Sequence, residues 1–306
     1  MRGLKRMSIR LTHRESPLRR LALRGVHPLT YLLPTSIGKP MRRGIRDRLA
    51  MPRADVVFVS FPKSGRTWVR VMVSRLYHTC LGMPGDDVIE FDNLHARDER
   101  VPRVLFTHDG EPWRRPEDLP ADKGMYRGKR IVLLVRNPID VSVSRYFHVR
   151  NRARALRHKE YASMPMGEFV WAPMGGIPTI VAFMNLWDAA RASLPDLLVL
   201  RYEDLRSEPH THLARLAEFL GLACTDDQVA EAVSFAAFEN LRKLEEKGAI
   251  ATARLGARQE GNPDSFKVRR GKVKGYRDYF TAAEAERMER YVRDRLAPGY
   301  GYPGGA

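Results

Sequence analysis

Cysteine is scarce in this chain of 306 residues, because Cys80 and Cys224 are the only two. So small a number excludes a framework of several disulfides and favours a reducing compartment, with both cysteines acting as ordinary apolar side chains. Long apolar runs are missing as well. No stretch approaches the length of a membrane span, and the first residues lack the continuous apolar core of a signal peptide.

Acidic residues are few relative to basic ones. The chain has 36 Asp and Glu against 53 Lys and Arg, which gives a formal net charge of +17 and a pI near 10.2. So basic a protein is expected to meet an anionic ligand, a nucleic acid or an acidic membrane surface. Charge alone does not choose among these three partners.

The deficit of acids is most pronounced in residues 1–53, where Glu15 and Asp47 are the only two. We divide the chain into this basic N-terminal extension and a catalytic domain over residues 54–306, since one α/β domain with inserted loops can reach that size. The extension interleaves leucines with arginines. It is either a cationic amphipathic segment that rests on anionic lipid or on the domain, or a partly ordered leader packed by its leucines. An organelle transit peptide is a further option.

Residues 55–81 change from a strand pattern to a helical pattern at a turn. Val56 to Phe61 form a β-branched and aromatic run typical of a buried strand, and helical spacing follows. The turn between them reads Pro62-Lys63-Ser64-Gly65-Arg66-Thr67. Backbone N–H groups at a helix start, the helix dipole and a lysine together bind phosphate, and Trp68 adds an aromatic surface beside them.

This turn differs from the common phosphate loop, Gly-x-x-x-x-Gly-Lys-Ser/Thr, because its lysine precedes its glycine. A plain strand, turn and helix with a chance lysine is therefore the alternative to a phosphate site. The conjunction of a strand, a cationic turn, Thr67 and Trp68 favours the phosphate site.

Three further apolar runs predict strands, and the first of them ends at His108. Strands that are apolar throughout are typical of a parallel sheet covered on both faces, so we predict an α/β three-layer sandwich. Ligands of such sheets collect at the carboxyl ends of the strands, which makes His108 a candidate for catalysis, although a lone histidine is often structural. The predicted strands are 104–107, 130–136 and 197–200, and the predicted helices are 138–150, 179–193, 210–220, 226–238 and 282–296.

Arg136 and Ser144 form a candidate phosphate pair. Arg136 ends a predicted strand, and Ser144 lies on the helix that should begin at Pro138. One turn and two helical rounds separate them, which is close enough for both side chains to face one phosphate. An arginine at a strand end and an exposed helical serine are each commonplace, so it is their spacing that is informative.

The stretch Phe-Pro-Lys-Ser-Gly-Arg-Thr-Trp at residues 61–68 resembles the 5′-phosphosulfate loop of sulfotransferases that use 3′-phosphoadenosine 5′-phosphosulfate (PAPS). The resemblance departs from the family at three positions. Arg66 stands where a threonine is usual, Phe106 where a lysine is usual, and Tyr276 where a tryptophan is usual. It continues in the family's order through Thr107-His108, Arg136 to Ser144, Tyr202-Glu203-Asp204 and Arg269-Arg270-Gly271.

The resemblance implies a role for each matched residue and implies no metal. His108 would be the general base, and Lys63 would stabilise the charge that builds on the bridging oxygen of the departing nucleotide. The implied PAPS-binding residues are Lys63, Ser64, Gly65, Arg66, Thr67 and Trp68 in the loop, Arg136, Ser144, Arg269, Arg270 and Gly271 around the 3′-phosphate, and Trp68, Tyr202, Ser234 and Phe235 at the adenine.

We therefore predict a basic, cytoplasmic sulfotransferase with a P-loop-like, phosphosulfate-binding strand, loop and helix. It would move a sulfuryl group from PAPS to a hydroxyl or amine of a small-molecule, lipid or glycan acceptor, and its basic N-terminus could touch an anionic membrane. No specific nucleic acid is expected. The alternatives are a nucleotide kinase, disfavoured by the position of the lysine and by the lack of an evident acidic magnesium site, and a non-catalytic polyanion binder, which steep salt dependence would identify.

Two segments between the motifs have more than one interpretation. Residues 150–178 contain Met164, Met166 and Met174, and either line an adaptable acceptor pocket or form a mobile surface loop with buried methionines. Residues 240–265 are rich in charge and glycine, and we interpret them as a lid or a disordered loop.

Overall fold

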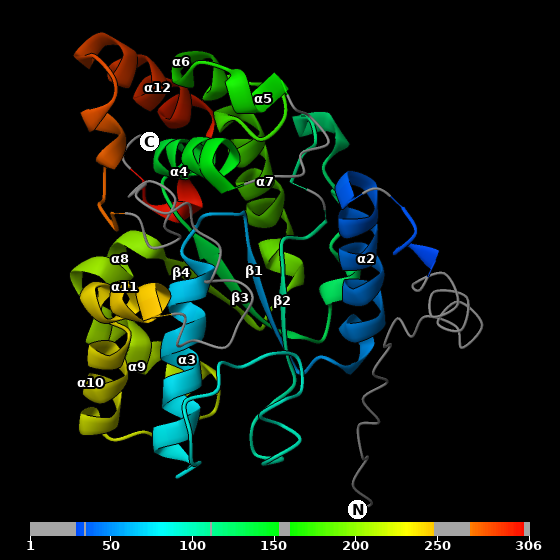
Figure 1. Ribbon diagram of the computed structural model, residues 1–306, viewed down its shortest axis with the longest axis vertical. Coiled ribbons are helices and arrows are strands. Elements are labelled where there is room, and N and C mark those ends of the chain that lie inside the picture. The colour runs from blue at the N-terminus through cyan, green and yellow to red at the C-terminus, as the bar shows by residue number, and fades with distance from the viewer. Residues whose placement is uncertain (1–28, 34, 111, 153–159, 248–269, 303–306) are drawn as a thin grey trace, which may run out of the picture.

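The computed structural model describes residues 29–33, 35–110, 112–152, 160–247 and 270–302 (Figure 1). Within these ranges a four-stranded parallel sheet has the order β2-β1-β3-β4. The strands are β1 (Val56–Ser60), β2 (Val104–Thr107), β3 (Arg130–Val135) and β4 (Leu197–Arg201). All four predicted strands and the parallel arrangement are confirmed.

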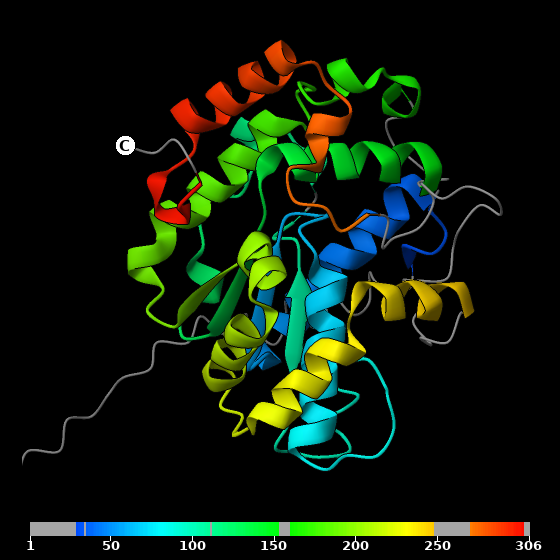
Figure 2. The same cartoon turned by 90° about the vertical axis from the view of Figure 1, so that its left-hand side faces the viewer.

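Helices cover both faces of the sheet, so the predicted three-layer sandwich is confirmed (Figures 1 and 2). Alternate residues of a strand point to opposite faces, which is why every position of β1 is apolar or small and buried. Val56 and Phe58 pack with α3 (Arg66–Cys80), α9 (Pro209–Phe219) and α10 (Asp226–Phe235). Val57 and Val59 pack on the other face with α4 (Pro138–Arg152), α7 (Ile177–Ala190) and α12 (Ala282–Arg295).

The predicted helices are confirmed, with ends that differ by a few residues. Two of them begin with a capping box, in which the side chains of Thr225 and Thr281 each accept from a backbone N–H three residues on. The other helices are α2 (Thr35–Ala50), α5 (Glu160–Ser163), α6 (Met166–Phe169), α8 (Tyr202–Ser207) and α11 (Phe238–Lys247). Short 3-10 turns span Met51–Arg53, Pro116–Asp118, Gly124–Tyr126, Arg191–Ser193, Gly275–Asp278 and Pro298–Tyr300.

Helix α2, which lies in the N-terminal part of the chain, packs beside β2 (Figure 1). Ile45 and Ala50 are buried, and Asp47 accepts a hydrogen bond of 2.8 Å from the hydroxyl of Thr107 at the end of β2. Part of the basic N-terminus is thus joined to the sheet directly beside His108. Residues 1–28 lie outside the described residues.

The structure describes part of each of the two segments that had more than one interpretation, residues 150–178 and 240–265. Met164, Met166 and Met174 are half-buried against a small cluster that contains Tyr161 and Phe169, which agrees with the packed methionines of the second interpretation of residues 150–178. The described part of this segment is not a loop throughout, because it contains α5 and α6. Residues 240–247 belong to helix α11, which corrects the interpretation of this part as a lid or disordered loop. The helix was missed because its apolar face is short and interrupted by charge. Residues 248–269 lie outside the described residues.

Cys80 and Cys224 form a disulfide, with Cα atoms 5.3 Å apart, which corrects the prediction that both are free apolar side chains. Cys80 ends α3, and Cys224 lies in the turn before α10. These two helices pack side by side on the same face of the sheet, so their ends meet although 144 residues separate the cysteines. In the described part of the chain, no helix is long and apolar enough to cross a membrane.

Candidate active site

A cavity of about 490 Å³ lies at the carboxyl ends of β1, β2 and β3. Its lining comes from separate parts of the chain, including α2, the turn after β1, the end of β2, helix α4, helix α8, helix α11 and residues 270–275. Asp140 is the one carboxylate among the described lining residues. The cations of the lining are Arg46, Lys63, Arg66, Arg136, Arg206, Arg270 and Lys272. The cavity is therefore suited to an anionic ligand.

The turn after β1 has the geometry of an anion-binding loop. Lys63 and Gly65 both have positive φ, 78° and 97° respectively, which folds the backbone tightly before α3 begins. A side chain at Gly65 would place Cβ only 2.6 Å from the ring of Tyr202, so glycine is required there. Lys63, Gly65, Arg66, Thr67 and Trp68 line the cavity, whereas the side chain of Ser64 is buried beside it.

His108 lies at the carboxyl end of β2 and is half-buried in the cavity wall. Its Nδ1 atom is 2.7 Å from the carbonyl oxygen of Ser60, at the end of the neighbouring strand β1. Its Nε2 atom is 2.6 Å from Nη2 of Arg66. A backbone carbonyl and a guanidinium therefore fix the orientation of the imidazole ring.

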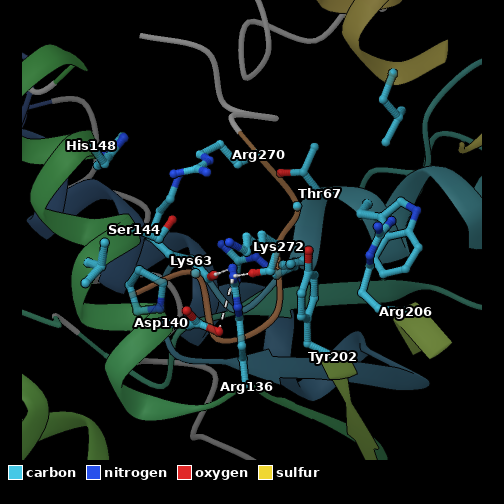
Figure 3. Close-up of a pocket in the computed structure, with 18 of the residues that line it drawn as sticks. Lys63, Thr67, Arg136, Asp140, Ser144, His148, Tyr202, Arg206, Arg270 and Lys272 are labelled. Carbon is cyan, nitrogen blue, oxygen red and sulfur yellow. Dashed lines mark hydrogen bonds and ion pairs between the residues drawn. The ribbon is translucent and has the colours of Figure 1, made fainter. Parts of the chain in front are cut away.

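Arg136 and Ser144, predicted as a phosphate pair, both line the cavity (Figure 3). The guanidinium of Arg136 donates to the carbonyl oxygens of Lys63 at 3.4 Å and Lys272 at 3.2 Å. Its Nη2 atom also lies 3.9 Å from a carboxylate oxygen of Asp140. Arg136 thus joins the turn after β1 to the loop before α12.

Asp140 fastens the same loop to α4. Its two carboxylate oxygens accept backbone hydrogen bonds from Lys274 at 2.8 Å and from Tyr276 at 3.1 Å. Burial raises the pKa of this carboxyl above its ordinary value, while the charge of Arg136 and the two N–H groups oppose that rise. A buried carboxylate at the edge of a cationic cavity therefore serves to position the loop that carries Arg270.

The loop over residues 270–275 closes one side of the cavity. Gly271 has a φ of 62°, and a Cβ there would lie 3.0 Å from the ring of Phe238. Arg270 donates to the hydroxyl of Tyr279 at 2.9 Å and pairs with Asp278 at 2.7 Å. Arg269, the other arginine implied in this loop, lies outside the described residues.

An aromatic wall stands opposite α4. Trp68 and Tyr202 meet edge to face with ring centres 5.6 Å apart, and the guanidinium carbon of Arg206 lies 5.7 Å from the ring centre of Trp68. Figure 3 shows Tyr202 and Arg206 on the side of the cavity away from Ser144 and His148 of α4. The indole N–H of Trp68 donates to the carbonyl oxygen of Ala236 at 2.9 Å. A flat ligand group could stack here, as the sequence predicted for Trp68 and Tyr202.

Two predicted adenine residues lie elsewhere. Ser234 is exposed near the end of α10, and Phe235 is half-buried with Arg75 4.8 Å from its ring, and neither lines the cavity. Phe238 and Leu241, at the start of α11, line it instead. Sequence reasoning missed them because it did not predict α11.

Sequence reasoning also missed several polar lining residues. Arg206 follows Tyr202 by one helical turn, a spacing that could have predicted that both share a face. Arg46 and His148 carried no signal, because only packing brings α2 and the third turn of α4 to the cavity. Among the described residues, no group of three or more His, Cys, Asp or Glu side chains is placed to hold a metal ion.

Known proteins share this sequence pattern. A family model described as a sulfotransferase domain matches residues 53–298. The chain is similar to cytosolic sulfotransferase 13 of Arabidopsis thaliana, with 27% identity over 268 residues, 79% of this chain and 77% of that protein. It is also similar to 3-alpha-hydroxysteroid sulfotransferase of Cavia porcellus, with 23% identity over 277 residues, 85% of this chain and 89% of that protein.

Solved structures share the fold. Mouse sulfotransferase SULT7A1 complexed with PAP superposes with a TM-score of 0.54 and 18% identity, over 79% of this chain and 84% of that one. Retinol dehydratase in a complex with retinol and PAP gives a TM-score of 0.54 and 19% identity, over 79% of this chain and 81% of that one.

Proposed function

Because the chain belongs to the sulfotransferase family, we propose that it transfers a sulfuryl group from PAPS to a hydroxyl or amine of an acceptor, with His108 as general base. The observation that carries this proposal is the composition of one cavity. This cavity is lined by four groups that the sequence predicted for the donor, together with His108. The four groups are the turn at residues 62–67, the pair Arg136 and Ser144, the loop with Arg270 and Gly271, and the aromatic side chains of Trp68 and Tyr202. These groups match the three parts of PAPS, which are a phosphosulfate, a 3′-phosphate and an adenine.

The donor would lie across the carboxyl ends of β1 and β3. Its phosphosulfate would sit at the start of α3, where backbone N–H groups, the helix dipole and Lys63 favour an anion. Its 3′-phosphate would meet Arg136, Ser144 and Arg270, since guanidinium groups bind phosphate bidentately. The adenine would lie against Trp68 and Tyr202, with Phe238 on the α11 side. Arg269 is proposed for the 3′-phosphate from the sequence alone.

The reaction would be an in-line displacement at sulfur. The acceptor oxygen or nitrogen forms a bond to sulfur, while the bond from sulfur to the bridging oxygen of the 5′-phosphate breaks. The acceptor proton passes to Nε2 of His108, and the electron pair of the broken bond stays on the phosphate of the leaving nucleotide. Lys63 stabilises the charge that builds on that bridging oxygen.

The acceptor would enter beside His108, and Pro62, Phe106 and Val143 are among the residues that line the same cavity. These apolar side chains support an acceptor with an apolar body and one nucleophilic group. The names of relatives, a steroid sulfotransferase and a retinol-bound structure, support the same class. The names of the plant relatives support a cytosolic protein.

Peripheral membrane contact is proposed for the segment before α2. Tyr31 and Leu32 are 67% and 83% exposed, and the guanidinium of Arg42 lies 4.4 Å from the ring of Tyr31. Exposed apolar side chains among arginines suit the surface of an anionic bilayer. Co-sedimentation with vesicles of anionic and of neutral lipid, for the protein and its Tyr31→Ser/Leu32→Ser variant, tests this contact.

The donor and the base can be tested separately. Adenosine 3′,5′-bisphosphate (PAP) should raise the melting temperature much more than adenosine 5′-phosphate, with about 2.7 kcal/mol of stabilisation at a hundredfold excess over Kd. Equal shifts from the two nucleotides would contradict the 3′-phosphate site. An acceptor should be identified by incubating the protein and PAPS with phenols, sterols, glycans, lipids and amines in turn. The quantity measured is the PAP that each compound causes to be released.

With that acceptor, His108→Ala should lower turnover by about a hundredfold or more and leave PAP binding nearly unchanged. A purely structural histidine would instead leave a polar partner unpaired, and its loss would lower the stability by about 1–3 kcal/mol without a selective effect on turnover.

A further inference from the structure

The contacts of His108 specify which nitrogen carries its proton. The carbonyl oxygen of Ser60, 2.7 Å from Nδ1, can only accept a hydrogen bond. The guanidinium of Arg66, 2.6 Å from Nε2, can only donate one. The imidazole is therefore neutral in this arrangement, with its proton on Nδ1 and the lone pair of Nε2 directed at Arg66.

This arrangement conflicts with general-base catalysis in one respect. Nε2 is the atom that has to take the acceptor proton, and Arg66 occupies it. An imidazolium would present an N–H to the N–H groups of a guanidinium, which places two donors and two positive charges together. Arg66 must therefore leave Nε2 before His108 can act.

The position of Arg66 offers it a second partner. It is the first residue of α3, directly after Gly65, and it lines the cavity in the turn to which we assign the phosphosulfate. Charge-assisted hydrogen bonds to phosphate or sulfate oxygens are about twice as strong as those to neutral acceptors. An anion bound at the start of α3 would therefore compete with Nε2 for the guanidinium.

We propose that Arg66 is a positioning residue that occupies Nε2 of His108 in the donor-free protein and moves to the phosphosulfate when PAPS binds, so that donor binding releases the base. The inference rests on the proposed function. It gives the reaction an order, since an acceptor that arrives first finds the base occupied. It also gives Arg66 a role that a threonine, usual at this position in the family that the sequence resembles, could not perform.

The position two residues before His108 provides no competing cation. Phe106 is 4% exposed, stacks on Phe58 with ring centres 4.8 Å apart, and has the guanidinium of Arg70 3.9 Å from its ring. Arg70 is in turn paired with Glu90 at 2.9 Å. Arg66 is therefore the guanidinium that contacts the imidazole in the described part of the chain.

Other charged groups around His108 are already engaged. On α2, Asp47 accepts from Arg46 at 2.7 Å and from Thr107 at 2.8 Å. Asp109, next in the chain, binds Lys123 and accepts from Tyr126 at 2.8 Å. Lys63 lines the same cavity. Substitution of Arg66 therefore changes its own contact with His108 and leaves these other charged groups in the sequence.

The experiment follows the imidazole of His108 by ¹⁵N-resolved NMR titration in the whole protein, with and without PAP and PAPS. Arg66→Met removes the charge and keeps the length, and Arg66→Lys keeps a charge in a different geometry. Arg53→Met, which removes an exposed arginine that pairs with Asp92, is the matched control. The assignment of the His108 signal comes from its loss in His108→Ala.

Without donor, we expect the wild type and Arg53→Met to hold the Nδ1–H form and to titrate about one pH unit lower than Arg66→Met, because the guanidinium disfavours the imidazolium. Arg66→Lys should lie between them. PAPS should shrink the difference between wild type and Arg66→Met to a few tenths of a unit. PAP, which lacks the sulfuryl group, should shrink it less.

Equal midpoints for wild type and Arg66→Met in the donor-free protein would overturn the proposal. A difference that PAPS leaves unchanged would overturn the movement of Arg66. If PAP binds as proposed and one of these two results is found, the role of Arg66 is wrong while the proposed donor site stands. Failure of PAP and PAPS to bind the wild type would overturn the proposed function together with this inference.

Discussion

The guanidinium carbon of Arg136 lies 4.2 Å from the ring centre of Tyr202. The same guanidinium donates to the carbonyl oxygens of Lys63 and Lys272. Arg136 therefore contacts the turn, the aromatic wall and the loop that we assign to the three parts of the donor, although these segments are far apart in sequence.

Replacement of Arg136 should weaken PAP binding. Arg136→Ala removes charged hydrogen bonds worth about 1.5–3 kcal/mol, so the Kd should rise roughly tenfold to a hundredfold. Arg136→Lys should give a smaller rise, because a lysine keeps the charge but not the planar, bidentate geometry. Isothermal titration calorimetry measures both values, with the exposed Arg97→Ala as control. An unchanged Kd in Arg136→Ala would remove Arg136 from the donor site.

Two substitutions distinguish whether α10 or α11 contributes a contact to the adenine. Phe238→Ala should weaken PAP binding by roughly fivefold to a hundredfold, because stacking on an aromatic ring is worth about 1–3 kcal/mol per base. Ser234→Ala should leave the Kd unchanged, since Ser234 is exposed and does not line the cavity. The opposite pattern would return the adenine contact to α10, as the sequence predicted.

The carboxylate of Glu289 should stabilise the protein in a pH-dependent way. Burial opposes its ionisation, but hydrogen bonds of 2.6 Å from Tyr276 and Arg277 outweigh burial and hold its pKa below the ordinary 4.5. Burial and the bond to Glu289 in turn raise the pKa of Tyr276 to about 12. A lowered folded-state pKa gives stability that is present above the unfolded value and is lost as the pH falls through the folded one.

Glu289→Gln should therefore lower the free energy of unfolding by about 1–2 kcal/mol at pH 7. The deficit should shrink as the pH falls below about 4.5 and disappear under more acidic conditions, where the wild-type carboxylate is protonated. Urea unfolding at a series of pH values measures this. Glu286→Gln, in the exposed pair with Arg290 on the same helix, should show almost no effect at any pH.

The disulfide should stabilise the fold. Closing a loop between residues 144 apart restricts the unfolded chain, so Cys80→Ser/Cys224→Ser should lower the free energy of unfolding by about 2–4 kcal/mol. Wild-type protein in dithiothreitol should match the variant in urea unfolding, and denatured protein without reductant should contain no titratable thiol. Two reactive thiols in protein that was never reduced would contradict the pairing and restore the prediction from the sequence.

The four strands of the sheet and the turn after β1 could be predicted from local sequence patterns. Each strand is a short apolar run, because a parallel strand buried on both faces needs an apolar or small side chain at every position. The turn at residues 62–67 could be predicted for a similar reason. A strand followed directly by glycine, cationic residues and helical spacing is a pattern of adjacent residues. The spacing of Arg136 and Ser144 was also local, because Arg136 comes directly after β3 and Ser144 lies on the helix that follows.

The contacts between segments that are distant in the sequence could not be predicted from such local patterns. Four contacts join residues that are separated in the sequence by at least one helix or strand. They are the disulfide between Cys80 and Cys224, the hydrogen bonds from the loop before α12 to Asp140, the position of Phe238 in the cavity lining and the contact of Arg66 with His108. Such contacts depend on how helices pack across the sheet, and packing is set by the summed shape of many side chains rather than by the pattern of any one segment. Arg66 looked like a departure from a phosphate loop, and only the adjacency of β1 and β2 placed it against the imidazole of His108.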